Sequence, residues 1–226
     1  LILGKGEVGK SLYNVLKKVH EVYIQDKKKE YWKNVDILHI CFPYSKDFIS
    51  NVKDYIEIYQ PKYTIIHSTV PVGTSTRCQA FHSPITGKHP HLEEGIKTFI
   101  KWLAPKDLFL KKYFEKARIK IKLVDKTEET EALKIWSTTQ YGISLILQKE
   151  IFKYCKKNKL DPKIIYTEAN KDYNEGYTKL GLKEVTRPIL KDIKGKIGGH
   201  CIIQNCNLLK SPITSFIKKL NKTYEE

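Results

Sequence analysis

The first half of the chain alternates short apolar runs with longer stretches of mixed character. The apolar runs predict strands at 1–3, 22–24, 36–42, 63–67, 80–83, 98–103 and 119–124. The stretches at 10–20 and 46–59 show helical periodicity. An alternation of strands and helices is typical of α/β proteins with a parallel sheet. We therefore predict a Rossmann fold, a doubly wound parallel sheet that binds ligands at the carboxyl ends of its strands.

The pattern changes after Asp125. Residues 127–159 contain little Gly and no Pro, and apolar side chains recur there at helical spacing. This predicts one long central helix. Residues 170–192 are predicted to be rich in loops with short helical pieces, and 211–223 to form a closing helix. We expect a dinucleotide-binding Rossmann domain at 1–125 and a smaller helical domain for substrate binding and dimerisation at 126–226.

A glycine loop follows the first predicted strand at once, and a helix follows the loop. The loop residues that we assign to cofactor binding are Gly4, Gly6, Glu7, Val8 and Gly9. The first glycine allows a tight turn, the second lets the backbone approach a pyrophosphate, and the third lets the helix pack against the strand. The helix N-terminus offers free N–H groups and a positive dipole end to the phosphates. The alternative is a glycine-rich turn in some other α/β protein.

An acidic residue at the expected distance supports a dinucleotide. Asp26 follows the second strand and is placed to accept hydrogen bonds from an adenosine ribose. Its carboxylate repels a 2′-phosphate, which favours NAD over NADP, although the lysines at 27–29 could receive such a phosphate. Residues at the ends of the next two parallel strands complete the predicted cofactor site: Phe42, Pro43, Ser68 and Thr69.

The charge of the chain has two readings. Lys and Arg total 41 against 25 Asp and Glu, a formal net charge of +16, which on its own suggests nucleic acid or a membrane surface. The lysines are spread over most segments, however, and no apolar run is long enough to cross a membrane. We therefore predict neither partner, and expect the positive field to attract a small, anionic substrate. An odd number of cysteines, 5, scattered along a Rossmann-like chain favours reduced thiols and the cytoplasm.

Three later segments carry groups that suit catalysis. The hydroxyls of Ser68 and Thr69 would orient a substrate or water, unless they only cap a Pro-Gly turn. Lys134 and Thr138 are four residues apart and share a helix face. A lysine in a cleft can act as an acid, a base or a stabiliser of an alkoxide. The alternative is that Lys134 is an ordinary surface lysine. Cys201 follows paired glycines, a position at which its thiolate would be exposed and reactive. The alternative is a buried, structural thiol.

Taken in order, these segments resemble the UDP-glucose/GDP-mannose dehydrogenase superfamily, which is related to the 6-phosphogluconate and β-hydroxyacid dehydrogenases. The glycine loop with Asp26 is similar to that superfamily's NAD loop. Residues 68–74 look like its S-T-V-x-x-G-T segment, Lys134 falls where it keeps its catalytic lysine, and 198–201 is similar to its G-G-x-C segment.

The resemblance implies an NAD-dependent dehydrogenase acting on a CH–OH group, with catalytic residues Lys134, Cys201, Thr69 and Thr138. Lys134 would stabilise the alkoxide or accept its proton, with a water held by Thr69. Cys201 would then trap the aldehyde as a thiohemiacetal and, after a second hydride transfer, as a thioester that water hydrolyses to an acid. The long helix would support a homodimer, as in that superfamily.

The chain departs from the superfamily's pattern at several places. Thr138 replaces an asparagine, Ile85 replaces the glutamate of an S-P-E-R segment, and 202–205 reads I-I-Q-N in place of L-P-K-D. The chain ends at Glu226, where the superfamily continues into a C-terminal nucleotide-sugar domain. The missing glutamate and the missing Lys/Asp pair keep open a non-catalytic or regulatory NAD-binding protein that retained the dehydrogenase fold.

The remaining predictions concern the substrate and metals. His82, His89 and His91 with Glu93 and Glu94 form a cluster in the sequence, but the spacing matches no strong metal motif and we predict no metal. We expect this loop to line the cleft instead. The residues that we assign to substrate binding are Lys88, His89, Arg187, Gly199 and His200.

Overall fold

The computed structural model describes residues 1–26, 32–87, 90–198 and 202–224. The chain forms two compact units, Leu1–Lys134 and Ile135–Glu226. The long helix α6 (Thr127–Lys157) begins in the first unit and continues through the second. The lysines at 27–29 and the predicted site residues Lys88, His89, Gly199, His200 and Cys201 lie outside the described residues.

The first unit is built on a parallel sheet of short strands. Its strands are β1 (Ile2–Leu3), β2 (Ile24–Gln25), β3 (Ile37–Ile40), β4 (Tyr63–Ile66) and β5 (Phe81–His82). They lie in the order β2-β1-β3-β4-β5, and all pairs are parallel. The order reverses between β1 and β3, which is the switch point at which Rossmann sheets bind ligands. The predicted α/β architecture is therefore confirmed.

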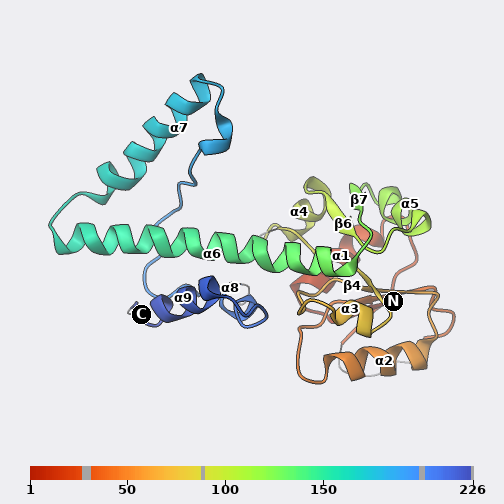
Figure 1. Cartoon of the computed structure of the whole chain (residues 1–226). Helices are drawn as coiled ribbons and strands as arrows, with labels where there is room; N and C mark the ends of the chain where they lie inside the picture. Colours follow the sequence, from red (N-terminus) through yellow and green to blue (C-terminus); the bar gives the residue numbers. More distant parts are fainter. Residues whose placement is uncertain (27–31, 88–89, 199–201, 225–226) are drawn as a thin grey trace. The chain divides into compact units, whose positions relative to one another are not determined.

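Helices cover both faces of this sheet. On one face α1 (Glu7–Leu16), α4 (Leu92–Thr98) and α5 (Leu108–Lys116) pack over Ile2 and Ile65. On the other face α2 (Phe48–Tyr59) packs over Leu3 and Ile66, near the short helix α3 (Thr74–Arg77). Figure 1 shows α2 below the sheet and α1, α4 and α5 above it. Because successive strand residues point to opposite faces and both faces are buried, the strands read as continuous apolar runs.

The last two predicted strands form a separate pair. β6 (Lys101–Leu103) and β7 (Ile121–Leu123) are parallel to each other and make a sheet of their own. A single antiparallel bridge between His82 and Ala104 connects this pair to β5. Ala104, which follows β6, meets His82 in the opposite direction, so among the described residues the β6–β7 pair does not extend the five-stranded parallel sheet.

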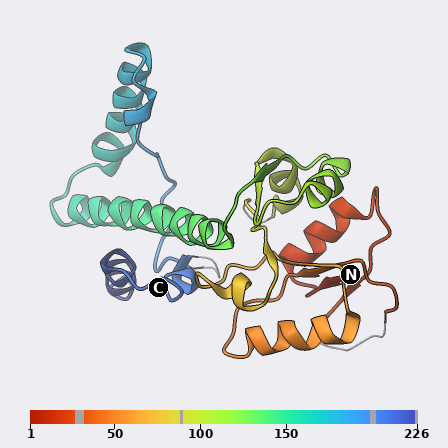
Figure 2. The same ribbon diagram turned by 45° about the vertical axis from the view of Figure 1, so that its right-hand side comes forward.

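The second unit consists of helices around α6. Its core joins Leu145 and Ile146 of α6 to Ile202 and Ile217, which belong to α8 (Ile202–Asn205) and α9 (Pro212–Asn221). Gly142 lets α8 and α9 approach α6 closely, since a Cβ there would lie 2.8 Å from Ile202. Figures 1 and 2 both show α8 and α9 on the side of α6 opposite α7 (Ala169–Lys179). None of the described helices is both long and apolar enough to span a membrane.

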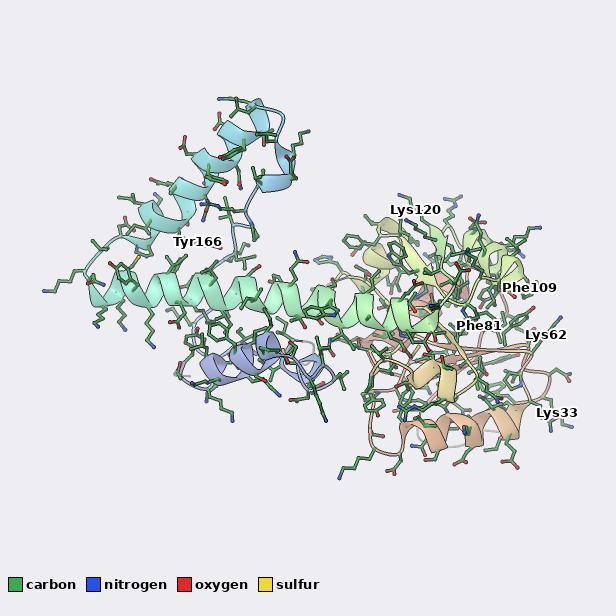
Figure 3. All side chains as sticks on the ribbon, in the orientation of Figure 1. Lys33, Lys62, Phe81, Phe109, Lys120 and Tyr166 are labelled. Carbon is green, nitrogen blue, oxygen red and sulfur yellow. The ribbon has the colours of Figure 1, made fainter. Side chains whose placement is uncertain are left out.

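The segment expected to be rich in loops is mostly helical. A π-helix (Lys163–Glu168) runs directly into α7, and a 3₁₀ turn (Lys183–Val185) follows. Side-chain pairs one turn apart support α7, although its Asn, Asp and Gly residues favour turns. Lys179 pairs with Glu175 at 2.7 Å, and the rings of Tyr173 and Tyr177 lie 4.6 Å apart. Tyr166, labelled in Figure 3, fixes the start of this segment by packing on Phe152 of α6.

Two glycines of the first loop predict opposite effects of the same substitution. A Cβ at Gly9 would overlap the carbonyl oxygen of Gly4, whereas a Cβ at Gly6 would meet nothing within 4 Å. We expect Gly9→Ala to lower the free energy of unfolding by about 2 kcal/mol or more, through overpacking. Gly6→Ala should cost less than about 1 kcal/mol. Urea denaturation of the two variants measures the difference, and equal stabilities would contradict the close packing of α1.

Candidate functional site

The glycine loop lies between the ends of its neighbouring strands. Gly4 has a φ of +107°, and its N–H donates to Gln25 O at 2.8 Å. A Cβ at this position would lie 2.9 Å from Phe42 N, so only glycine fits the turn. Gly6 is the N-cap of α1, and the space beside it is open. Glu7 and Val8 form the first turn of α1, where helical N–H groups have no intrahelical partner.

The other predicted cofactor residues surround this loop at the carboxyl edge of the sheet. The exposed carboxylate of Asp26 lies beside it, with Lys5 N 3.5 Å from Oδ1. Ser68 Oγ donates to Phe42 O at 2.5 Å, which joins the ends of β3 and β4. Pro43 is exposed and Thr69 is half-buried. The structure thus brings these residues to one edge of one unit.

One face of α6 attaches the helix to the same edge. This face carries four residues at helical spacing, which contact α3 and its N-cap, the end of β5 and the segment after β5: Thr127, Thr130, Glu131 and Lys134. Thr127 Oγ1 lies 2.9 Å from Thr76 Oγ1. Thr130 Oγ1 lies 2.8 Å from His82 Nδ1. The first turns of α6 are therefore held against the segments that follow β4 and β5.

Glu131 is the strongest of these attachments. Its side chain is 0% exposed, and its two oxygens accept from Gly73 N at 2.6 Å and Ser75 N at 2.7 Å. These amides belong to the N-terminus of α3, which favours a negative charge. Burial raises the pKa of Glu131, and the hydrogen bonds from Ser75 and Gly73 oppose that rise. The carboxylate fixes the 68–74 segment to α6.

The predicted catalytic lysine lies one turn further along this face. Lys134 Nζ donates to Ile85 O at 2.8 Å, and Ile85 follows β5. This contact brings the ammonium to the edge that carries the glycine loop and the Ser68–Thr69 hydroxyls. Ile85 is buried in the core, so an apolar side chain occupies the position of the superfamily's glutamate.

Thr138 belongs to the second unit. Its hydroxyl donates to Ile135 O at 2.8 Å and accepts from Asn205 Nδ2 of α8 at 3.2 Å. Asn205 is 7% exposed. An amide is therefore present beside this turn of α6, although it comes from α8 and not from position 138.

A group of buried polar side chains lies under the sheet edge. His82 Nε2 is 3.3 Å from Ser68 O, and His67 Nε2 is 2.9 Å from His39 Nδ1. Desolvation by burial lowers the pKa of His39 and His67 far below the ordinary value, and that of His82 to about 3. Burial also lowers the pKa of Lys101 to about 7.

Arg187 does not join Thr138 and Asn205. Its guanidinium stacks 3.5 Å from the ring centroid of Tyr173, and its backbone pairs with Asn174, both on α7. Figures 1 and 2 place α7 on the opposite side of α6 from α8.

The histidine and glutamate cluster is dispersed. His82 contacts Thr130, His91 pairs with Glu94 at 3.0 Å, and Glu93 accepts from Asn14. In the described part of the chain no three His, Cys, Asp or Glu side chains are arranged to hold a metal ion.

Solved structures share this fold over nearly the whole chain. A UDP-D-ManNAc dehydrogenase from Pyrococcus horikoshii has a TM-score of 0.73 at 15% identity, covering 98% of this chain and 68% of that one. A UDP-glucose dehydrogenase from Pyrobaculum islandicum has a TM-score of 0.74 at 14% identity, covering 98% and 67%. A Mycobacterium tuberculosis 3-hydroxyisobutyrate dehydrogenase has a TM-score of 0.70 at 14% identity, covering 98% and 91%.

These similarities bear on the fold. They confirm that the chain is similar in fold to UDP-sugar and hydroxyacid dehydrogenases, the groups that its motifs resemble. The sequence itself matches no protein-family model and no curated protein.

Sequence reasoning missed Glu131 and Lys101 in the first unit and Asn205 in the second. Glu131 had a usable signal, since it precedes Lys134 by three positions and shares its helix face. Lys101 gave none, because one buried lysine among many lysines has no distinctive pattern. Asn205 occupies the fourth position of the divergent I-I-Q-N segment, where its amide had no predicted partner.

The buried histidines predict that acid destabilises the first unit. In the unfolded chain His82 binds a proton below about pH 6.5, whereas in the folded chain it binds one only near pH 3. Its contribution to stability is therefore present above pH 6.5 and is lost as the pH falls towards 3. In the His82→Gln variant the side chain at position 82 cannot bind a proton. Between pH 6.5 and pH 4 the free energy of unfolding of this variant should therefore fall by about 3 kcal/mol less than that of the wild type.

Denaturant titrations of both proteins across this range test the pH dependence. Other buried histidines contribute equally to the two proteins, so the difference in slope isolates His82. Parallel slopes would show that His82 is protonated in the folded chain.

Proposed function

We propose that the chain is an NAD-dependent oxidoreductase that oxidises an alcohol of a small polar or anionic substrate. The observation that carries the proposal is the meeting of three groups at one sheet edge of the first unit. These are the open glycine loop, the Ser68–Thr69 hydroxyls and the Lys134 ammonium. The fold shared with dehydrogenases that act on sugar nucleotides and hydroxyacids supports the reaction class.

The residues of the loop fit a dinucleotide. The N–H groups at the N-terminus of α1, which have no intrahelical partner, and the open space at Gly6 suit a pyrophosphate. Asp26 would accept hydrogen bonds from the ribose hydroxyls, which favours NAD over NADP. Phe42, Pro43, Ser68 and Thr69 would contact the rest of the cofactor. When bound, NAD supplies the hydride acceptor.

The chain's own residues would manage the proton and the developing charge. Lys134 Nζ would stabilise the alkoxide or receive the hydroxyl proton, while its bond to Ile85 O directs it. The Thr69 hydroxyl would orient a water or the substrate. Thr138, whose hydroxyl accepts from Asn205 within the second unit, remains a proposed catalytic residue.

A second stage would use Cys201. Its sulfur would add to the aldehyde carbon to form a thiohemiacetal. A second NAD, when bound, would supply the acceptor for a second hydride. With the hydroxyl proton also released, for which Lys134 is the nearest proposed acceptor, the Cys201 adduct would become a thioester. Water would hydrolyse the thioester to the acid and the free thiol. Lys88, His89, Gly199, His200 and Arg187 remain proposed contacts of the anionic substrate.

We assign the substrate and the dimer contact to the helical unit. Helices α6 and α7 and their flanking turns expose large apolar side chains that a second copy would cover: Trp136, Tyr141, Leu147, Tyr154, Ile164 and Leu180. We infer that this contact forms a homodimer. We also infer that the protein is cytoplasmic, which agrees with four buried cysteines that form no disulfide: Cys41, Cys78, Cys155 and Cys206.

A second candidate is a non-catalytic, regulatory NAD-binding protein. The burial of Ile85 at the superfamily's glutamate position favours it, because this side chain gives no polar group to the site. Cofactor binding without turnover on any alcohol would distinguish this candidate.

Cofactor binding is tested by calorimetric titration of NAD and NADP. Gly6→Ala should keep the fold and weaken NAD binding by about tenfold or more, because the methyl group enters the space for the pyrophosphate. Asp26→Asn should weaken NAD binding by about tenfold, through loss of charge-assisted hydrogen bonds.

The matched control is Asp54→Asn, an exposed aspartate on α2. Its NAD affinity should equal that of the wild type. Wild-type affinity in both Gly6→Ala and Asp26→Asn would exclude the glycine loop as the cofactor site.

Catalysis is tested by following NADH formation with a panel of UDP-sugars and 3-hydroxy acids. Lys134→Met should lower kcat by about 100-fold or more, the usual effect of losing a proton-transfer group. Its affinity for NAD should change little. Lys126→Met removes an exposed lysine just before α6 and should keep full activity. Turnover by Lys134→Met at the wild-type rate would remove this lysine from the mechanism.

A further inference from the structure

A lysine side chain is buried inside the first unit. Lys101 is the first residue of β6 and is 4% exposed. In the part of the chain that the structure describes, no carboxylate contacts it, and its charge is offset by carbonyl dipoles and the ring of Phe114, whose centroid lies 5.6 Å from Nζ. A buried ammonium without a counter-charge is costly, so it persists only where its contacts have a use.

The ammonium of Lys101 binds the segment that follows β5. Lys101 Nζ donates to Ser83 O at 2.6 Å and to Pro84 O at 3.2 Å. Proline has no N–H, so its carbonyl is the only backbone group by which Pro84 can be held. Ser83 is also fixed by its hydroxyl, which donates to Trp102 O at 2.8 Å.

The next carbonyl along the chain belongs to the other lysine. Ile85 O accepts from Lys134 Nζ at 2.8 Å. Two ammonium groups thus hold the carbonyl oxygens of three consecutive residues, Ser83, Pro84 and Ile85. Since the carbonyl direction at one residue depends on the backbone angles of its neighbours, the contacts of Lys101 determine where the acceptor of Lys134 points.

We propose that Lys101 is a positioning residue for Lys134: it fixes the 83–85 segment, and the Ile85 carbonyl in turn fixes the Lys134 ammonium. The contacts themselves do not depend on the reaction. The importance of the position rests on the proposed function, in which Lys134 handles the substrate's proton.

A chain of buried side chains supports the same segment from the other side. His67 Nδ1 lies 2.7 Å from Ser83 O and 3.1 Å from Lys101 Nζ. His67 Nε2 contacts His39 Nδ1, and His39 Nε2 lies 3.1 Å from the Tyr113 hydroxyl. With each N–H or O–H directed towards Ser83, the links Tyr113–His39, His39–His67 and His67–Ser83 each have one donor and one acceptor, whereas His67 Nδ1–H and Lys101 Nζ are then two donors side by side. Ser83 O then accepts from both His67 and Lys101.

Several titratable groups face Lys101. They come from β3 and the residue after it, the ends of β4 and β5, and α6: His39, Cys41, His67, His82 and Lys134. Tyr113 of α5 joins this group only through His39. Burial lowers the pKa of Lys101 to about 7, and the nearby charge of Lys134 adds to that decrease. The two lysines therefore interact in two ways: by repulsion between their charges and through the backbone of residues 83–85, to which both donate hydrogen bonds.

Competitive acetylation with acetic anhydride tests the proposal on the whole chain, with and without NAD. Mass spectrometry of each lysine peptide across pH 7 to 11 yields the pKa and the free-amine reactivity of that lysine. In Lys101→Met the free-amine reactivity of Lys134 should rise by about threefold or more, the factor expected for loss of one net hydrogen bond. Lys120→Met removes an exposed lysine beside β7 (Figure 3) and should leave Lys134 unchanged.

Unchanged Lys134 reactivity in folded Lys101→Met would overturn the proposal. Circular dichroism establishes whether the variant folds. If it does not, Lys101→Gln is used, which keeps one hydrogen-bonding head but cannot span both carbonyls. The same rise is expected there, and its absence overturns the proposal. Lys101→Arg, whose guanidinium can donate to both carbonyls, should restore wild-type reactivity.

Failure of this inference is distinct from failure of the proposed function. Wild-type turnover by Lys134→Met would end the catalytic role of Lys134, while acetylation would still measure whether Lys101 holds it. Loss of turnover in Lys134→Met together with unchanged acetylation in folded Lys101→Met would overturn the positioning role alone.

Discussion

The buried carboxylate of Glu131 is the interaction on which the candidate site depends. It binds two backbone amides of the segment after β4, and it lies one helical turn before Lys134. A buried carboxylate needs such donors, and the amides at a helix N-terminus need such an acceptor, so each satisfies the other. Because α6 is rigid over this turn, the same contact brings Lys134 to the edge of the sheet where the glycine loop lies.

Much of the first unit could be predicted because its constraints are local. The glycine loop follows from spacing alone, since Gly4 needs a positive φ and Gly9 needs the absence of a Cβ. The strands are apolar runs because helices cover both faces of the sheet. The two-stranded β6–β7 sheet was not predictable, because nothing within those segments indicates that only Ala104 would bridge to His82.

The rest of the site depends on contacts between distant parts of the chain. Lys101 lies 33 positions before Lys134, and only the fold shows that both bind consecutive carbonyls. The helix α7 was missed for a different reason. Its Asn, Asp and Gly residues favour turns, and that preference led to the prediction of loops. The helix is supported by the pairing of Glu175 with Lys179 and of Tyr173 with Tyr177. Local preference and tertiary contact disagree at these places, and tertiary contact decides the structure.

The central claim is that a dinucleotide binds at the glycine loop of the first unit, and chemical-shift mapping tests it most directly. Titration of NAD into ¹⁵N-labelled protein should shift the amide signals of Gly4, Gly6, Glu7 and Gly9, together with Asp26 and Ser68. The exposed helix α7 should be unaffected. Saturable shifts confined to other residues, or no shifts at millimolar NAD, would contradict the claim.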